Sequence, residues 1–330
     1  MQIDEFLAPR VLIVSGKGGV GKTTVAAALA LVAARRGRTV CLAEVDRKGS
    51  LPKLFGAPDL GYEPKEMSPG VWGMNIVPEA ALAEYLEVQY HMKRISKVFS
   101  STQFVDYITT AAPGLKDILV LGKIWYLEQG RDTSAKQPHF DTIVVDAPAA
   151  GHMLSFLSAP AGLSDALQIG PVRRQSDWLL DMLRDPARTR VHLVTLPEEM
   201  PVSETLETAE ALRTRVGIAT GTVFANAVYS RLFTPAEAKR VTELNASDAG
   251  ALVTEAKAVG LDLDHDDIEA LLGYARFLEA RRAIQNQHLK ELKKGVTDPV
   301  VELPFLFSAG LALPDIETLA DRIELEIEAA

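Results

Sequence analysis

The sequence contains very little cysteine: Cys41 is the single such residue among 330. One thiol cannot form an intramolecular disulfide, and one chain cannot build a zinc site from several cysteines. Cys41 lies in the apolar run 39–45, where we expect it to be a small buried side chain. Disulfide-stabilised folds and cysteine-based metal centres are therefore excluded.

The sequence also lacks long apolar runs, a basic start and an excess of positive charge. No uninterrupted apolar stretch reaches the roughly eighteen residues that a membrane-spanning helix needs. The first residues, 1–5, are acidic and lack the basic segment of a secretory signal peptide. The net charge of −9 provides no overall field that attracts nucleic acid. We expect a soluble cytoplasmic protein that does not bind nucleic acid.

What the sequence does contain is an alternation of short apolar runs and helical patterns. A strand is expected at 11–15, a helix at 22–36 and a second strand at 39–46, which together form a βαβ unit of a parallel sheet. Further strands are expected at 75–77, 142–146, 191–196, 221–226 and, at an edge, 300–303. The predicted fold class is α/β, with a doubly wound, mostly parallel sheet in a single domain over residues 1–330.

Two stretches are longer than a connection between strands requires, and both carry helical patterns. Residues 81–130 have apolar positions at helical spacing. Residues 232–294 include a helix from Asp264 to Lys294 with acids in its first turn and lysines in its last, which matches the helix dipole. We expect both stretches to be helical insertions that form one subdomain at one end of the sheet.

The segment 16–23, GKGGVGKT, satisfies the phosphate-binding pattern G-x-x-x-x-G-K-[ST]. Its glycines let backbone N–H groups converge on phosphate oxygens, Lys22 brings charge to the β- and γ-phosphates, and the Thr23 hydroxyl ligates Mg²⁺. The pattern predicts ATP and Mg²⁺ as cofactors. The ATP-binding residues expected here are Gly16, Lys17, Gly18, Gly19, Val20, Gly21, Lys22, Thr23 and the adjoining Thr24.

The same glycines also fit the dinucleotide-binding pattern G-x-G-x-x-G. Glu44 or Asp46 would then be the acidic residue that contacts a ribose. The pair Lys22-Thr23 directly after the third glycine is required by the phosphate loop and is unexplained by dinucleotide binding. We therefore favour the phosphate loop.

The extra lysine at position 17 gives this loop the form of a deviant Walker A motif. That form resembles the family of MinD, ParA, the nitrogenase iron protein, the arsenite-pump ATPase and the tail-anchored-protein-targeting ATPase. The segment 146–157, DAPAAGHMLSFL, is similar to the switch II of the last two branches, D-T-A-P-T-G-H-T-L-R-x-L. The resemblance to these two branches extends roughly over residues 10–230 and 300–320.

The resemblance implies roles for individual residues. Lys17 would cross a dimer interface to the partner's nucleotide, where it would act with Lys22 as a catalytic charge. Asp146 would hold Mg²⁺, mostly through water, and the catalytic Asp46 would orient the attacking water. The remaining ATP contacts implied by the resemblance are Gly151, Asn226, Pro304 and Phe305.

The sequence departs from the family at its switch I and at its cysteines. Switch I reads DRKGS at 46–50 instead of D-P-A-H-[SN], so only the aspartate and the final small residue are kept. The CxxC pair that clamps zinc and the three cysteines that bind arsenite are both missing. The resemblance therefore implies a Mg-ATP-hydrolysing dimer without arsenite or zinc sites. It would be a homodimer, or a heterodimer with a related ATPase, that couples ATP-driven closure to binding of a client protein. Such a client could be a membrane protein, and a partner could place the dimer at the membrane periphery.

Two alternatives stay open. One is a positioning ATPase similar to ParA or MinD, although the amphipathic C-terminal segment 315–328 is acidic, which anionic lipids would repel. The other is a weakly hydrolysing regulatory subunit of a heterodimer, which the altered switch I motivates.

Overall fold

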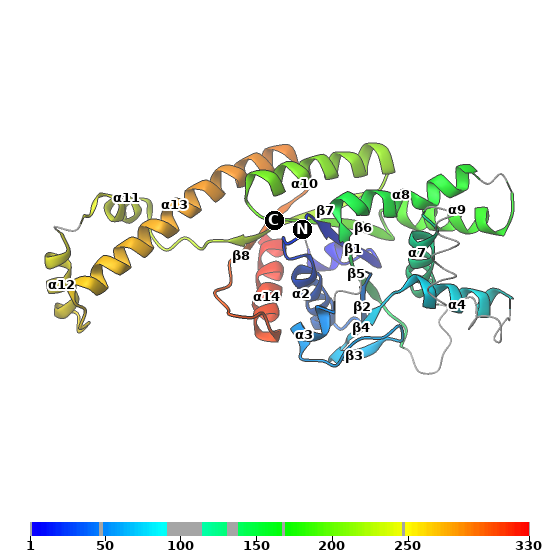
Figure 1. Cartoon of the computed structure of the whole chain (residues 1–330), viewed down its shortest axis with the longest axis horizontal. Coiled ribbons are helices and arrows are strands. Elements are labelled where there is room, and N and C mark those ends of the chain that lie inside the picture. The colour runs from blue at the N-terminus through cyan, green and yellow to red at the C-terminus, as the bar shows by residue number, and fades with distance from the viewer. Residues whose placement is uncertain are drawn as a thin grey trace.

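A computed structural model describes residues 2–45, 49–90, 114–130, 138–166, 169–245 and 248–329. These residues are built around an eight-stranded sheet (Figure 1). The edge strand β3 is antiparallel to its neighbour, and the other seven strands are parallel. In spatial order the strands are β3 (Lys65–Ser68), β4 (Val71–Asn75), β2 (Val40–Glu44), β5 (Thr142–Ala149), β1 (Val11–Gly16), β6 (Thr189–Thr195), β7 (Thr220–Val228) and β8 (Val300–Pro304).

Strand β1 lies inside the sheet and is buried along its whole length. Successive side chains of a strand point to opposite faces. Leu12 and Val14 therefore belong to one hydrophobic core, whereas Val11 and Ile13 belong to the other. A continuous apolar run is what a strand covered on both faces requires.

Helices cover both faces of the sheet. On one face, α2 (Lys22–Arg35) packs against α14 (Leu313–Ala329), with the short helices α1 (Ile3–Phe6) and α3 (Leu51–Phe55) beside them. The Arg35–Asp321 and Arg36–Glu328 ion pairs, both at 2.6 Å, join α2 to the C-terminal helix. The other face carries α7 (Leu115–Glu128), α8 (Ala150–Ala166), α9 (Pro171–Arg184), α10 (Glu199–Ala211) and the π-helical turn η1 (Leu212–Val216).

Most strand predictions from the sequence are confirmed. β1, β2, β5, β6, β7 and the edge strand β8 all overlap their expected ranges. The strand expected at 75–77 is displaced, because β4 ends at Asn75. Burial raises the pKa of the Cys41 thiol to about 12, against the opposing charge of Lys123, as expected for an inert core thiol.

The antiparallel edge strand β3 was not predicted. Its sequence, KEMS, is polar, and its residues are exposed or half-buried. β3 is joined to β4 through Gly70, whose φ of +77° lies in the left-handed region that favours glycine. Because β3 covers an edge rather than a core, it has no apolar alternation for a sequence pattern to detect.

The two helical insertions lie on opposite sides of the sheet, so the expectation of one subdomain at one end was wrong (Figure 1). α4 (Pro78–Tyr90) packs on α7 beyond one edge. α11 (Pro235–Glu243), α12 (Ala249–Ala258) and α13 (His265–Gly295) extend beyond the other edge. The remainder of the first insertion, residues 91–113, lies outside the described residues.

Helix α13 confirms the predicted long helix. Asp264 caps its N-terminus through a capping box with Asp267, and Lys293 and Lys294 stand in its last turn. Among the described residues, no helix combines the length and apolar character needed to cross a membrane.

Candidate functional site

The glycine-rich loop connects the end of β1 to the start of α2, as the sequence predicted. Gly16, Gly19 and Gly21 have φ values of +153°, +83° and +93°, which favour glycine. A Cβ atom on Gly16 would lie 2.0 Å from the carbonyl oxygen of Val194 in β6. The loop therefore passes against the backbone of the neighbouring strand, and a side chain at Gly16 would displace it.

Asn226, near the end of β7, fixes the loop from the other side. Its Nδ2 donates a hydrogen bond of 2.9 Å to the carbonyl oxygen of Val20. A Cβ atom on Gly21 would lie 2.3 Å from the same nitrogen. Two of the predicted residues, far apart in sequence, are thus brought together by the order of the strands.

The two lysines of the loop have different surroundings. Lys22 is buried, with 7% of its surface exposed, and its Nζ donates to the carbonyl oxygen of Lys17 at 3.0 Å. The Lys17 side chain is one-third exposed, and its Nζ donates to Glu204 Oε2 at 2.6 Å. A buried ammonium needs hydrogen-bond partners. Lys22 therefore curls back onto the loop, whereas Lys17 reaches α10.

Thr23 and Asp146 meet at the start of α2. Thr23 Oγ1 donates a 2.6 Å hydrogen bond to Asp146 Oδ2, and Asp146 is fully buried in β5. The register of the sheet sets this contact, because Asp146 pairs with Val14 of β1 just before the loop begins. A hydroxyl and a carboxylate oxygen together are the hard donors that Mg²⁺ prefers.

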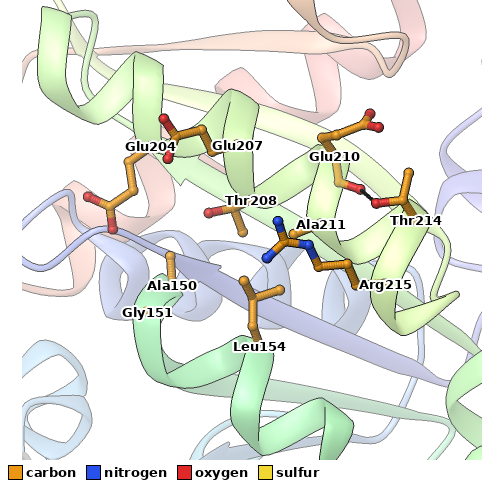
Figure 2. A pocket seen from close by; sticks show the side chains of 10 residues that line it. All are labelled: Ala150, Gly151, Leu154, Glu204, Glu207, Thr208, Glu210, Ala211, Thr214 and Arg215. Atoms are coloured by element: carbon orange, nitrogen blue, oxygen red, sulfur yellow. Dashed lines mark hydrogen bonds between the residues drawn. The ribbon is translucent and has the colours of Figure 1, made fainter.

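The expected switch II segment begins where β5 turns directly into α8, with Gly151 in the first turn of that helix. Between α8 and α10 lies a cavity of about 400 Å³ (Figure 2). Glu204, which binds Lys17, lines the cavity, and so does Gly151. The lining residues are Ala150, Gly151, Leu154, Glu204, Glu207, Thr208, Glu210, Ala211, Thr214 and Arg215.

Two acidic residues stand at the end of β2: Glu44 is its last residue, and Asp46 follows it. Asp46 lies outside the described residues, so its role stays a prediction. Glu44 is buried, and its carboxylate oxygens accept hydrogen bonds from the backbone N–H groups of Gly49 and Ser50 at 3.2 and 3.3 Å. The Glu44 carboxylate is therefore engaged with the backbone of its own loop.

An aromatic cluster surrounds the residues expected at the adenine end. Phe305 follows Pro304, the last residue of β8, and its N–H donates to the carbonyl oxygen of Val228 at 2.9 Å. Its ring stacks on Tyr229, with centroids 4.8 Å apart and planes at 17°, and Phe307 packs against both rings. The end of β7 that carries Asn226 therefore lies beside Phe305, although no sequence pattern pointed to Tyr229 or Phe307.

Glu204 is the other site residue whose role the sequence did not reveal. It stands in the stretch Ser203–Thr205, which resembles the family, but that resemblance carried no contact to Lys17. Carboxylates are frequent on exposed helix faces, so only the fold identifies this one as the partner of the loop lysine.

Comparison with known proteins is consistent with this geometry. The family model of anion-transporting ATPases matches residues 9–181, which span the glycine-rich loop, Asp146 and Gly151. The chain belongs to this ATPase family. Its fold is accordingly that of a P-loop NTPase with a doubly wound sheet and added helices.

Three relatives show how far the similarity extends. The chain is 33% identical over 319 residues to "ATPase BagA" of Mycobacterium tuberculosis, covering 95% of this chain and 92% of the relative. A "Putative arsenical pump-driving ATPase" of Halobacterium salinarum is 28% identical over 236 residues, which are 66% of this chain and 35% of that protein. "ATPase get3" of Schizosaccharomyces japonicus is 28% identical over 180 residues, 51% and 52% of the two chains. Similarity along nearly the whole chain thus extends to the mycobacterial member of the family.

Proposed function

We propose that the protein binds and hydrolyses Mg-ATP as a dimer and couples ATP-driven closure to the binding of a client protein. The observation that carries the proposal is the convergence at one point of the glycine-rich loop, the buried Lys22 and the Thr23–Asp146 pair. An anion with a divalent cation is the ligand for which this combination is suited.

Different residues of the site are assigned to the phosphates and to the cation. The N-terminus of α2, opening at Lys22, presents unpaired backbone N–H groups and the positive end of the helix dipole. Lys22 exchanges its contact with the Lys17 carbonyl for phosphate oxygens. Thr23 and Asp146 would hold the Mg²⁺ ion, which when bound would neutralise phosphate charge.

The adenine ring is assigned to the ends of β7 and β8. Asn226, Pro304 and Phe305 lie there, beside the stacked ring of Tyr229. A planar base is favourably placed against aromatic faces and a side-chain amide. Gly151, in the first turn of α8, contributes the backbone of the segment that senses the γ-phosphate.

Lys17 and Asp46 are assigned to hydrolysis. Lys17 leaves Glu204 and reaches the nucleotide of the partner subunit, where its charge stabilises the transferring phosphoryl group. Asp46 orients the attacking water. A single chain holds Lys17 on its own α10, so closure of a homodimer or heterodimer exchanges this contact for one between subunits.

One structural observation weighs against the alternative of a positioning ATPase bound to membranes. The apolar face of α14 packs on α2 and is buried, at Ile316, Leu319, Ile323 and Ile327. This C-terminal helix therefore cannot insert its apolar face into a lipid surface without leaving the core. We propose that the protein is cytoplasmic and that it contacts membranes only through a partner or client. We also propose that it has no arsenite site and no zinc site.

Calorimetry and size measurement test the proposal together. We expect Mg-ATP to bind the native chain and Lys17→Ala but not Lys22→Ala, because Lys22 contacts the phosphates of its own subunit. A nonhydrolysable ATP analogue should promote subunit association in the native chain and not in Lys17→Ala. Binding of a dinucleotide in place of ATP would overturn the assignment.

Turnover measurements separate hydrolysis from binding. Asp46→Asn should bind Mg-ATP as the native chain does and hydrolyse it at least about a hundredfold more slowly. Equal turnover rates would remove Asp46 from catalysis and favour the regulatory-subunit alternative. Release of a copurifying client upon ATP addition would test the coupling, and a client that is insensitive to nucleotide would contradict it.

A further inference from the structure

A groove of about 540 Å³ opens among the three helices of the second insertion, α11, α12 and α13. These helices meet at one tip of the molecule, away from the nucleotide loop (Figure 1). Glu255 is the single charged residue of the lining, and the others are aliphatic or aromatic. Large lining side chains stay open to solvent, because Val259, Leu261 and Leu271 are 76%, 55% and 53% exposed. An exposed apolar patch of this kind marks a binding surface.

The walls of the groove are mainly helical, which restricts the backbone of an occupant. Backbone groups inside a helix are already hydrogen-bonded to one another. An extended peptide laid along such walls would leave its own N–H and C=O groups without protein partners, whereas a helix satisfies its own backbone and presents only side chains. The groove is therefore suited to the apolar face of a helix.

The carboxylates around the groove give it a negative rim. Glu255 lines it, and Asp262 stands between two lining leucines of the segment that joins α12 to α13. Asp267 lies within about 70° of the middle of the lining face of α13, at 100° of rotation per residue. Within the described residues, none of these three carboxylates forms an ion pair.

The cations of the same segment, residues 231–276, do not offset this rim. Lys239 pairs within α11, with the glutamate four residues further on. Arg231 and Arg276 direct their guanidinium groups at backbone carbonyl oxygens. Arg240 and Lys257 are exposed and lie more than about 100° from the inward faces of α11 and α12. The groove is thus apolar at its floor and acidic at its edge.

We propose that this groove binds an amphipathic helix of a partner protein that carries lysine or arginine beside its apolar face. The apolar side chains of that helix cover Val259, Leu261 and Leu271, and its cations lie near Glu255 and Asp262. Charge complementarity of this kind selects the partner and its orientation. The proposal goes beyond the binding and hydrolysis of ATP and does not rest on them, because the groove lies outside the nucleotide site.

Fluorescence anisotropy with a labelled peptide tests the proposal on the full chain without nucleotide. The probe is a leucine–lysine peptide of about 15 residues with leucines at helical spacing, beside the same peptide with glutamate in place of each lysine. We expect the lysine peptide to bind and the glutamate peptide to bind at least about tenfold more weakly. Equal binding of the two peptides would overturn the basic partner. Binding of a neutral apolar dye but of neither peptide would assign the groove to a small molecule instead.

Matched substitutions show whether the peptide lies in the groove. Leu271→Ser should weaken binding of the lysine peptide at least about fivefold. Phe277→Ser should not, since Phe277 is also 53% exposed but lies about 150° from the lining face of α13. Glu255→Lys should weaken binding about tenfold, and Glu269→Lys, about 130° from that face, should have little effect at the same change of net charge.

Equal effects within either pair of variants would mean that the peptide is attracted to the acidic chain as a whole, and would overturn the site. All four variants should bind Mg-ATP as the native chain does, which also shows that they are folded. Loss of peptide binding and loss of nucleotide binding are therefore separate results, and the two proposals fail separately.

Discussion

In the single chain Lys17 pairs with Glu204, whereas in the proposed dimer Lys17 contacts the nucleotide of the partner subunit. Its ion pair with Glu204 is short, at 2.6 Å, but both side chains are about one-third exposed. Partly exposed pairs of this kind contribute only about 0–1 kcal/mol. The Lys17–Glu204 contact is therefore strong enough to orient the lysine and weak enough to be exchanged on closure.

Glu204→Gln should lower the ATP concentration needed for closure, by up to about fivefold, because the competing charge is removed. Titration of closure with an ATP analogue, followed by a fluorescence or size signal, measures this shift. Glu207→Gln is the matched control, since Glu207 lines the same cavity, whereas the Lys17 ammonium pairs with Glu204. A higher ATP requirement in Glu204→Gln would mean that Glu204 acts in the closed state instead.

At the scale of residues, the sequence predicted the parts of the site that are contiguous. Gly16–Thr23 form one loop, and Asp146 ends an apolar run, so local pattern and chemistry sufficed. The partners Glu204 and Tyr229 could not be found in the same way. Each becomes a neighbour of the site only because β6 lies next to β1 in the sheet and β7 lies next to β6.

At the scale of elements, Gln285 is one of the side chains that connect α13 to the sheet. Gln285 is buried, its Oε1 accepts from the N–H of Tyr229 at 2.8 Å, and its Nε2 donates to the carbonyl oxygen of Ala227 at 2.9 Å. Ala227 has a φ of +56°, uncommon for a residue with a side chain. Gln285 therefore replaces the ladder bonds that the chain loses as it leaves β7.

Gln285→Ala should destabilise the protein by about 2–3 kcal/mol, because two half-buried backbone groups lose their partners and a buried side chain is truncated. The Tyr229 amide should also exchange hydrogen with solvent faster. Denaturant unfolding and hydrogen exchange measure these effects. Gln287→Ala, on the exposed side of the same helix, should change neither. Unchanged exchange at Tyr229 would show that α13 is held mainly by its apolar contacts.

The strand predictions also show where an element escapes detection. The buried strand β1 opens with four consecutive apolar residues, and β6 carries Val191, Leu193 and Val194, so apolar runs indicate both strands. β3 is polar and pairs on one side only, and its existence depends on the turn at Gly70. For such an edge strand, tertiary pairing rather than sequence pattern decides the structure.

At the scale of the whole molecule, strand order explains the position of the insertions. The first insertion lies between β4 and β5 in the chain, and the second lies between β7 and β8. These strands stand on opposite sides of β1 in the sheet, so the insertions project in opposite directions (Figure 1). The sequence revealed both insertions, but it could not place them because it does not state the order of the strands.

The stability of the whole sheet should depend on pH through His192 of β6. Burial lowers the pKa of His192 to about 4 from an ordinary value of 6.5, and its ring lies 5.0 Å from that of Phe6. Between about pH 6.5 and pH 4, His192 is protonated in the unfolded chain but stays neutral in the folded chain. Stability should therefore fall from pH 6.5 towards pH 4, by about 2 kcal/mol between pH 7 and pH 5.

Urea unfolding at pH 7 and pH 5 measures this loss. His192→Leu should lose about 2 kcal/mol less than the native chain over the same interval, because the titrating group is gone. His265→Gln, at the exposed start of α13, should behave as the native chain does. Equal pH dependence in His192→Leu would assign the acid sensitivity to other groups.

Helix α13 is long, so a small rotation at one end produces a large displacement at the other end. Between Gln285, where it is fastened to the end of β7, and His265 the helix extends about 30 Å. A tilt of about 10° at the Gln285 end would displace the far end by about 5 Å. Asn226 is only three residues from Tyr229, which Gln285 holds, so a movement of Asn226 would have only a short stretch of backbone to cross before it reached the base of α13.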